Sequence, residues 1–405
     1  MSRPIHADVV IVGARCAGAA TAMLLARAGH DVVLLERAAL PGDTTSTHSL
    51  SRAGIVQLAR WGLLETVVAS GAPAIRTVDL YRYDGSDGAS RRAAPRVVRQ
   101  VVEDRTGVDH MLAPRRHELD RILAEAAVAA GARLLDRTAV RDVVLDEHGR
   151  ATGVRAIAAD GRLLDVRARL VIGADGVKSR VARQVRAPVV ESHAPSGVCL
   201  YTEVGDVPWA GFELHVAERR FSGVFPTHGR EAAIFLMLPA EDAGRLLHAG
   251  SRRPRVWMDF LREAAPDLAD RVAAGTVRAP LRGTLALPNH VRQAAGRGWA
   301  LVGDAGYHRD PITAHGITDA FRDAELLATA ADTLLRDPTL EREALASYEQ
   351  RRDAALAPTF ALTRELAAFP SPERFVELQE RLARALDDEA YAVAALPDLN
   401  GVLTP

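Results

Sequence analysis

The sequence predicts an α/β fold in which a parallel-sheet domain is interleaved with an antiparallel-sheet domain and is followed by a helical segment. Three observations favour this fold. A β-branched run, Val9–Val12, ends at Gly13 and leads into a helix rich in Ala and Leu. Short alternating strands, separated by Gly, Pro and Asp, occupy residues 198–238. Buried-strand character returns at Trp299–Val302, so the first domain is completed only after the second.

The amino-terminal elements form a predicted βαβ unit. Val9–Val12 is the first strand, Ala17–Ala28 has helical periodicity, and Gly29 ends that helix. Val32–Leu35 is a second buried strand that ends at Glu36. A unit of this kind is typical of a doubly wound, Rossmann-like sheet.

The next elements continue the same domain. A helix is expected at Leu119–Ala130, and strands are expected at 133–145 and 152–158 around a turn at His148-Gly149. Leu170–Ile172 is a further buried strand.

The middle of the chain has a different pattern from its ends. Strands at Val198–Val204 and Ala232–Leu238 indicate an antiparallel sheet. Helices are expected at 317–336, 340–369 and 372–396. We therefore divide the chain into a nucleotide-binding domain (1–75, 100–185 and 285–335), an antiparallel-sheet domain (76–99 and 186–284) and a carboxy-terminal helical segment (336–405).

Composition argues for a small-molecule partner. The 405 residues include 51 Lys+Arg against 52 Asp+Glu, a formal net charge of -1, which gives no summed field for nucleic acid or an anionic membrane. Cys16 and Cys199 match no disulfide or metal-ligand spacing. We expect no metal site, no membrane span and no signal peptide, and thus a cytoplasmic protein.

The first motif, Gly13-Ala14-Arg15-Cys16-Ala17-Gly18, lies where the first strand turns into the first helix. Backbone N–H groups and the helix dipole at such a turn can hold a pyrophosphate. Glu36 follows 23 residues after Gly13, at the spacing of an acid that accepts ribose hydroxyls. Arg15 replaces the middle glycine of the usual fingerprint, and its guanidinium could itself meet a phosphate.

Two further motifs follow buried strands. Asp175-Gly176 comes after Leu170–Ile172; by itself it is compatible with a tight turn capped by the aspartate. Gly303-Asp304 ends the strand at Trp299–Val302, and Asp304 can accept from a polyol hydroxyl. The loop then passes Pro311 to Gly316, where the positive end of a helix would favour an anion.

With these three motifs in order, residues 7–335 resemble the FAD-dependent aromatic hydroxylases of the p-hydroxybenzoate hydroxylase type, a superfamily that includes flavin halogenases and geranylgeranyl reductases. The resemblance implies a Rossmann-like FAD-binding domain, an antiparallel-sheet substrate domain and a C-terminal helical segment. It places the family's phosphate- or ribityl-binding arginine on Arg116. The implied cofactor-binding residues are Gly13, Arg15, Cys16, Ala17, Gly18, Glu36, Arg37, Arg116, Asp175, Gly176, Gly303, Asp304, Pro311, Gly316 and Ile317.

The third motif departs from the family pattern beside the expected flavin ring. Tyr307 stands where the family usually has His, with His308 following, Ala314 replaces a Gly and Thr318 replaces an Asn. These changes bear on the substrate class more than on FAD binding. His315 is expected close to the pyrimidine side of the ring.

The implied chemistry requires no side-chain nucleophile, and the sequence does not identify a single catalytic residue. His48 could orient substrate or shuttle a proton, although a hydrogen-bonded loop histidine is the simpler alternative. Tyr201 and His215 could line a substrate pocket, against the alternative of plain sheet packing. The candidate catalytic residues are His48, His315, Pro311, Tyr201 and His215.

The resemblance implies a FAD-dependent monooxygenase. NADH or NADPH would reduce FAD, O2 would add to the reduced ring, and the flavin hydroperoxide would hydroxylate an apolar or aromatic small molecule. One alternative is a flavin-dependent reductase of a carbon–carbon double bond. The resemblance implies that the family's halogenases use a lysine between the flavin and the substrate. Lys178, the only lysine, lies in the second motif on the nucleotide side, so a halogenase is disfavoured. A non-catalytic FAD-binding protein is the last alternative, and substrate identity and oligomeric state stay open.

Overall fold

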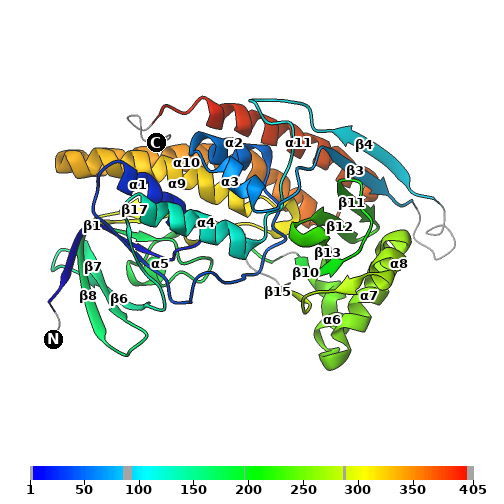
Figure 1. Cartoon of the computed structure of the whole chain (residues 1–405), viewed down its shortest axis with the longest axis horizontal. Coiled ribbons are helices and arrows are strands. Elements are labelled where there is room, and N and C mark those ends of the chain that lie inside the picture. Colours follow the sequence, from blue (N-terminus) through cyan, green and yellow to red (C-terminus); the bar gives the residue numbers. More distant parts are fainter. Residues whose placement is uncertain (1–2, 85–93, 196, 286–288, 399–405) are drawn as a thin grey trace.

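The computed structural model describes residues 3–84, 94–195, 197–285 and 289–398. It contains two large sheets, and the two carboxy-terminal helices pack against the cores of both (Figure 1). The fold class predicted from the sequence is confirmed. Among the described helices, none combines the length and the apolar character that a membrane crossing requires.

The first sheet has a parallel core. Its strands lie in the order β17 (Ala295–Gly296), β18 (Trp299–Leu301), β8 (Leu163–Gly173), β1 (Ile5–Val12), β2 (Val32–Leu35) and β5 (Arg133–Leu135), and β7 (Ala151–Ile157) and β6 (Ala139–Leu145) extend it from β8. The strands from β18 to β5 in this order are parallel. Because β1 lies between β8 and β2, the chain crosses over on both sides of it, and ligands bind at the carboxyl ends of strands at such a point.

The single strand expected over 133–145 is wrong, because the chain forms β5 and β6 with a bend between them. Arg137 has φ 47°, and the Thr138 backbone N–H donates to the Glu36 carbonyl oxygen at 2.7 Å. The bend therefore ties this segment to the end of β2.

Helices cover the first sheet on one face. They are α1 (Cys16–Arg27), α2 (Arg52–Arg60), α3 (Leu64–Ala69), α4 (Arg116–Ala129) and α9 (Gly316–Arg336), and the short α5 (Arg180–Gln184) lies on the opposite face. α1 packs against both α4 and α9. Its buried residues include Ala19, Ala20 and Ala22, which let these helices approach closely, and the larger Met23, Leu24 and Leu25.

The second sheet is antiparallel apart from one pair. Its order is β14 (Thr276–Val277), β10 (Gly197–Gly205), β13 (Glu231–Pro239), β12 (Arg220–Pro226), β11 (Phe212–Ala217), β3 (Thr77–Arg82) and β4 (Arg96–Val101), and β15 (Arg282–Leu285) also pairs with β10. β3 and β11 are the parallel pair.

Helices that we did not predict cover one face of this sheet: α6 (Gly244–Leu247), α7 (Arg253–Ala264) and α8 (Pro266–Ala274). Trp257, Phe260 and Leu268 fill the space between them and the sheet. The other face carries an aromatic layer in which Phe225 and Phe235 lie 5.0 Å apart between ring centroids.

The predicted domain boundaries differ from the strand pairing in two places. Residue 99 falls inside β4, which continues to Val101. β9 (Val189–His193) does not join the large antiparallel sheet; it pairs with β16 (Asn289–Arg292), which pairs with β19 (Tyr307–His308).

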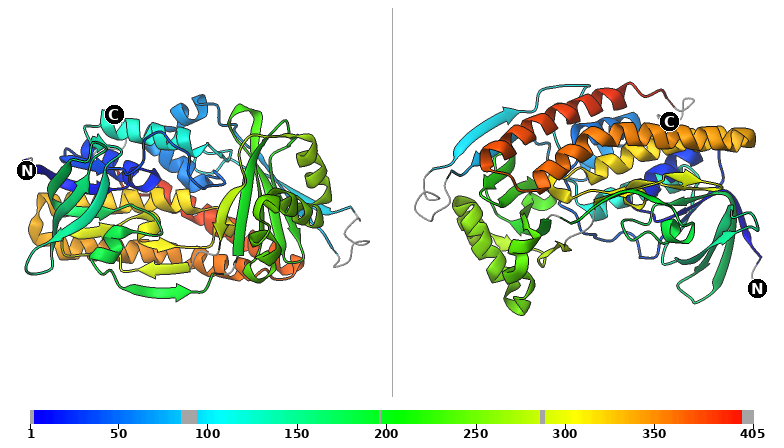
Figure 2. Two further views of the ribbon diagram at one scale, coloured as in Figure 1. Left: turned by 90° about the horizontal axis from the view of Figure 1, so that it is seen from below. Right: turned by 180° about the vertical axis from the view of Figure 1, so that it is seen from behind.

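The carboxy-terminal helices α10 (Glu341–Ala367) and α11 (Pro372–Ala394) lie beside α9 (Figure 2). α11 packs on α2 and α10, and its first half adds Phe375 to the aromatic layer of the second sheet. These helices therefore join the two sheets.

His215 belongs to a buried polar network in the second sheet. Its Nε2 lies 3.3 Å from Glu213, its Nδ1 lies 3.1 Å from the Tyr83 hydroxyl, and its ring stacks on Tyr81 at 4.4 Å. Arg271 donates two hydrogen bonds to Glu213, at 3.0 and 2.5 Å. Although burial opposes ionisation, His215 and Arg271 lower the pKa of Glu213 from 4.5 to about 2.

A depressed carboxyl pKa stabilises the fold above its ordinary value of 4.5, and this stabilisation is lost as the pH falls towards 2. Glu213→Gln should therefore lower the free energy of unfolding at neutral pH by about 1–3 kcal/mol. The deficit should narrow as the pH falls below 4.5. Urea unfolding over this pH range measures it.

The matched control is Glu241→Gln, because Glu241 forms an exposed ion pair with Arg219. It should change the unfolding free energy by less than about 0.5 kcal/mol. A Glu213→Gln deficit that does not vary with pH would contradict the assigned ion pairing.

Candidate functional site

A cavity of about 980 Å³ lies where the parallel strands end, since Val12, Leu35 and Val302 line it. It brings together most of the residues that the motifs predicted. The predicted residues that line it are Gly13, Arg15, Cys16, Ala17, Glu36, Arg37, Arg116, Asp175, Gly176, Asp304, Pro311, His315, Gly316 and Ile317. Those that do not line it are Gly18, Gly303, His48, Tyr201 and His215.

The turn from β1 to α1 is built on close backbone contacts. Gly13 has φ 102°, and a Cβ there would lie 2.4 Å from the Ala174 carbonyl oxygen. A Cβ on Gly18 would lie only 1.8 Å from the Gly13 carbonyl oxygen. Gly18 is therefore required for packing within the turn and lies outside the cavity wall.

Glu36 fixes this turn from the end of β2. Its buried carboxylate accepts from the Ala14 backbone N–H at 3.0 Å and from the Ala38 backbone N–H at 2.9 Å. The side chain thus holds the loop while it lines the cavity.

Asp120, on α4, is the residue that sequence reasoning missed. Its fully buried carboxylate accepts two hydrogen bonds from Arg116 Nη2, at 3.0 and 3.1 Å. Arg15 Nη1 donates to it at 3.0 Å and Cys16 Sγ at 3.2 Å. Asp120 therefore orients both cavity arginines, and its i,i+4 spacing from Arg116 was the only available signal.

The second motif forms the expected capped turn and also lines the cavity. Asp175 lines the cavity, and its carboxylate caps the start of α5 by accepting from Ser179 Oγ at 2.5 Å and from the Arg180 backbone N–H at 2.6 Å. The tight capped turn is therefore present.

The third motif forms another part of the cavity wall. Asp304, in the short 3-10 turn η5 (Gly303–Ala305), projects into the cavity. Enclosure by protein raises the pKa of its carboxyl above the ordinary value. The 21-residue helix α9 begins at Gly316, so its positive end faces the same space.

Between Asp304 and Gly316, several buried polar atoms lack hydrogen-bond partners among the described residues. They are Nε and Nη1 of Arg309, Oγ1 of Thr313 and Nδ1 of His315, while Arg309 Nη2 is ion-paired with Asp319. All three residues line the cavity. Since unpartnered buried donors and acceptors are costly, this wall suits a ligand with polar groups of its own.

His48 lies just behind the cavity wall, between the lining residues Thr47 and Ser49. Its backbone is left-handed, with φ 70°, and its Nε2 lies 3.3 Å from Glu203 on β10. Both side chains are buried, and burial lowers the pKa of the imidazole, which favours its neutral form.

Two predicted pocket residues pack inside the second sheet. Tyr201 accepts a hydrogen bond from the Ser46 backbone N–H at 3.0 Å, which fixes the loop before His48. His215 is held in the network with Glu213 and Tyr83. In both cases the packing alternative describes the observed contacts.

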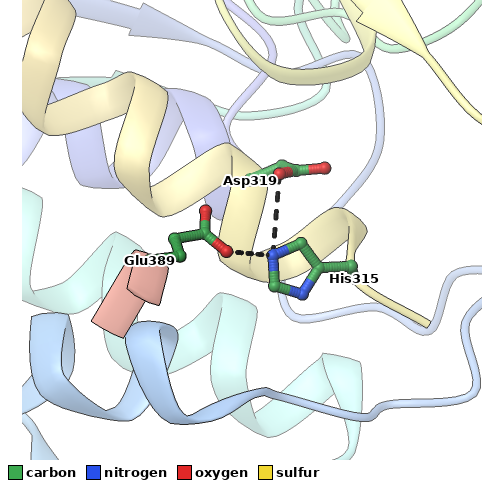
Figure 3. Close-up of side chains that lie close together, drawn as sticks. All are labelled: His315, Asp319 and Glu389. Atoms are coloured by element: carbon green, nitrogen blue, oxygen red, sulfur yellow. Dashed lines mark hydrogen bonds and ion pairs between the residues drawn. The ribbon is translucent and has the colours of Figure 1, made fainter. Parts of the chain in front are cut away.

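His315 forms a cluster with Asp319 and Glu389 (Figure 3). These are residue types that bind metals, and we expected no metal from the sequence. Arg322 donates to Asp319 at 2.9 Å and to Glu389 at 2.7 Å, and Arg309 lies 2.5 Å from Asp319. Because guanidinium groups already neutralise these carboxylates, we interpret the cluster as an ion-pair network.

The turn, the acid after β2 and the start of α9 together define a site for a dinucleotide cofactor. A sequence model of the family described as "FAD binding domain" matches residues 6–361. The chain belongs to this family, and it is a FAD-dependent oxidoreductase. The resemblance inferred from the motifs is thereby confirmed.

Curated relatives cover most of the chain. A digeranylgeranylglycerophospholipid reductase from Methanopyrus kandleri is 28% identical over 89% of this chain and 89% of its own length. A kynurenine 3-monooxygenase from Salinispora arenicola is 29% identical over 96% of this chain and 83% of its own length.

Solved structures share the fold. PqsL of Pseudomonas aeruginosa, described as a probable FAD-dependent monooxygenase, has a TM-score of 0.76 and 25% identity, over 93% of this chain and all of that chain. The flavin-dependent brominase Bmp2 has a TM-score of 0.79 at 18% identity, over 94% of this chain and 93% of its own, which shows the fold alone.

Replacing Asp304 by Ala should weaken FAD binding by about 1–3 kcal/mol, the loss expected for a charge-assisted hydrogen bond and its unpaired neighbours. Fluorescence titration of the apoprotein with FAD measures the change. Asp142→Ala removes the same charge from an exposed position on β6 and should leave the affinity unchanged. Equal affinities for wild type and Asp304→Ala would remove Asp304 from the site.

Two glycine substitutions test how tightly the β1–α1 turn is packed. Gly18→Ala should destabilise the apoprotein by more than about 2 kcal/mol, because the new methyl group overlaps the Gly13 carbonyl. Gly316→Ala meets no protein atom within 4 Å and should leave apoprotein stability unchanged. Thermal unfolding without FAD measures both, and equal stability of the two variants would contradict the turn geometry.

Proposed function

We propose that this protein is a monooxygenase that hydroxylates an apolar or aromatic small molecule, with NADH or NADPH as the electron source. The observation that carries the proposal is the aromatic layer of the second sheet, which adjoins the FAD cavity. Ile312 belongs to this layer together with Tyr201, Phe225 and Phe235, and its neighbours Pro311 and Thr313 line the cavity. Aromatic side chains at this place favour an aromatic substrate.

The relatives support the same reaction class. The kynurenine 3-monooxygenase spans nearly the whole chain, and PqsL has been solved in complex with 2-aminobenzoylacetate. Both names refer to aromatic molecules that carry a carboxylate.

The chain's own residues would hold the cofactor. The α1 amino terminus and Arg116 would meet its phosphates, Glu36 its ribose and Asp304 its ribityl chain. When bound, FAD supplies hydride acceptance and the activation of O2. The ends of the parallel strands, residues 44–47 and the start of α9 line the cavity and would shield part of the bound cofactor from water.

His48 is our proposed proton carrier. Glu203 orients Nε2, and the buried Nδ1 has no hydrogen-bond partner among the described residues. A neutral imidazole held in this way can accept a proton at Nδ1 from a substrate hydroxyl or amine, in the manner of a carboxylate–histidine pair. His48 lies just behind the cavity wall, next to the lining residues Thr47 and Ser49.

A second candidate is reduction of a carbon–carbon double bond. It is favoured by the digeranylgeranylglycerophospholipid reductases, whose identity to this chain reaches 28% over 89% of its length. The two reactions differ in their need for O2.

Turnover should insert an atom of labelled O2 into the product even with excess chloride or bromide. Kynurenine, 2-aminobenzoylacetate and a digeranylgeranyl lipid are the first probes, chosen by stimulation of NADH or NADPH oxidation. Mass spectrometry of the product measures the label. A reduced product formed without O2 would favour the reductase, and a halogenated product would favour a halogenase.

A further inference from the structure

The last helix contacts a residue that lines the FAD cavity, although this helix lies outside the family match. The match ends at residue 361, within α10, whereas α11 spans Pro372–Ala394. Glu389 of α11 contacts His315, the residue that directly precedes α9 and lines the cavity. This contact is therefore a property of the chain beyond its family domain.

The contact is short and buried. His315 Nε2 lies 2.6 Å from Glu389 Oε2 and 3.8 Å from Asp319 Oδ1, so two carboxylates face the same ring nitrogen (Figure 3). The side chains of His315, Asp319 and Glu389 are 1%, 4% and 8% exposed. Water therefore contributes little to balancing their charges.

The charged groups around His315 are connected through Arg322. Arg322 is shared by three carboxylates, lying 2.9 Å from Asp319, 2.9 Å from Asp323 and 2.7 Å from Glu389. Arg309 lies against Asp319 from the loop before α9. Burial raises the pKa of Asp323 to about 6, and Arg352 also acts on that carboxyl. Arg322 and Arg309 thus serve Asp319 and Glu389, and His315 is the third group in contact with these two carboxylates.

The carboxyl pKa of Glu389 agrees with these contacts. Burial alone would raise its pKa, but His315, Arg322 and Arg309 hold the pKa of the carboxyl well below its usual range. An ionised carboxylate in this position favours the protonated form of the imidazole that it contacts.

We propose that Glu389 is a positioning residue that keeps His315 protonated beneath the FAD cavity, so that α11 takes part in the cofactor site. The imidazolium adds a full positive charge to the partial charge at the start of α9. Electrons added to bound FAD bring negative charge into the cavity, and this cation stabilises it. The proposal rests on FAD as the occupant, and it holds for either reaction considered above.

The two-electron potential of bound FAD tests the charge on His315. His315→Gln removes a cation and should lower the potential, with the reduced cofactor bound about tenfold less favourably, equivalent to about 30 mV. His315→Lys keeps a cation and should retain the wild-type potential. If His315 were neutral, the Gln variant would match wild type and the Lys variant would exceed it, which would overturn the proposal.

The role of Glu389 is read directly from the ring nitrogens by NMR of the FAD-bound protein labelled with nitrogen-15 in histidine. The signal absent from His315→Gln identifies His315. At neutral pH both of its nitrogens should carry protons in wild type, whereas only one should do so in Glu389→Gln. Asp388→Asn, an exposed charge on the same helix, should match wild type.

A bare ring nitrogen on His315 in the wild-type protein would contradict the proposal, and so would an unchanged proton count in Glu389→Gln. Neither measurement needs a substrate. Failure of the oxygen-labelling experiment would therefore leave this proposal intact, and failure here would leave the proposed reaction intact.

Discussion

The close contact of the β1–α1 turn with the chain after β8 is the constraint on which the rest of the site depends. Gly13 lies so near the Ala174 carbonyl, and Gly18 so near the Gly13 carbonyl, that no side chain fits at either position. The contact brings the amino terminus of α1 to the ends of β1, β2 and β18. Glu36 then closes the turn by accepting two backbone N–H groups. Without this geometry the cavity would have no phosphate-binding wall.

Polar side chains in the cavity wall, and His48 just behind it, are oriented by buried carboxylates. Asp120 on α4 fixes Arg15 and Arg116, and Glu203 on β10 fixes His48. Glu389 on α11 contacts His315 at the start of α9. The start of α9 therefore contacts the last helix, and α10 and α11 pack against the cores of both sheets.

The sequence predicted the elements whose local pattern is strong. The strand β2 at Val32–Leu35 was predicted without error, and the boundaries of α9 differed by a single residue, because caps and periodicity are local signals. α7 and α8 were missed, since no element was assigned between Leu238 and Trp299. Asp120 and Glu389 could not be found, since their roles depend on contacts across the fold. Tyr201 and His215 could not be placed either, because alternation in a strand does not reveal which face meets a cavity.

The central claim is that the cavity between the β1–α1 turn and α9 binds FAD. The most direct test is the flavin content of the purified protein, measured by absorbance and by chromatography of the cofactor released on denaturation. FAD in equimolar amount with the chain, or stoichiometric recovery after addition of FAD to the apoprotein, is the predicted result. A colourless protein that cannot be reconstituted with FAD would contradict the account.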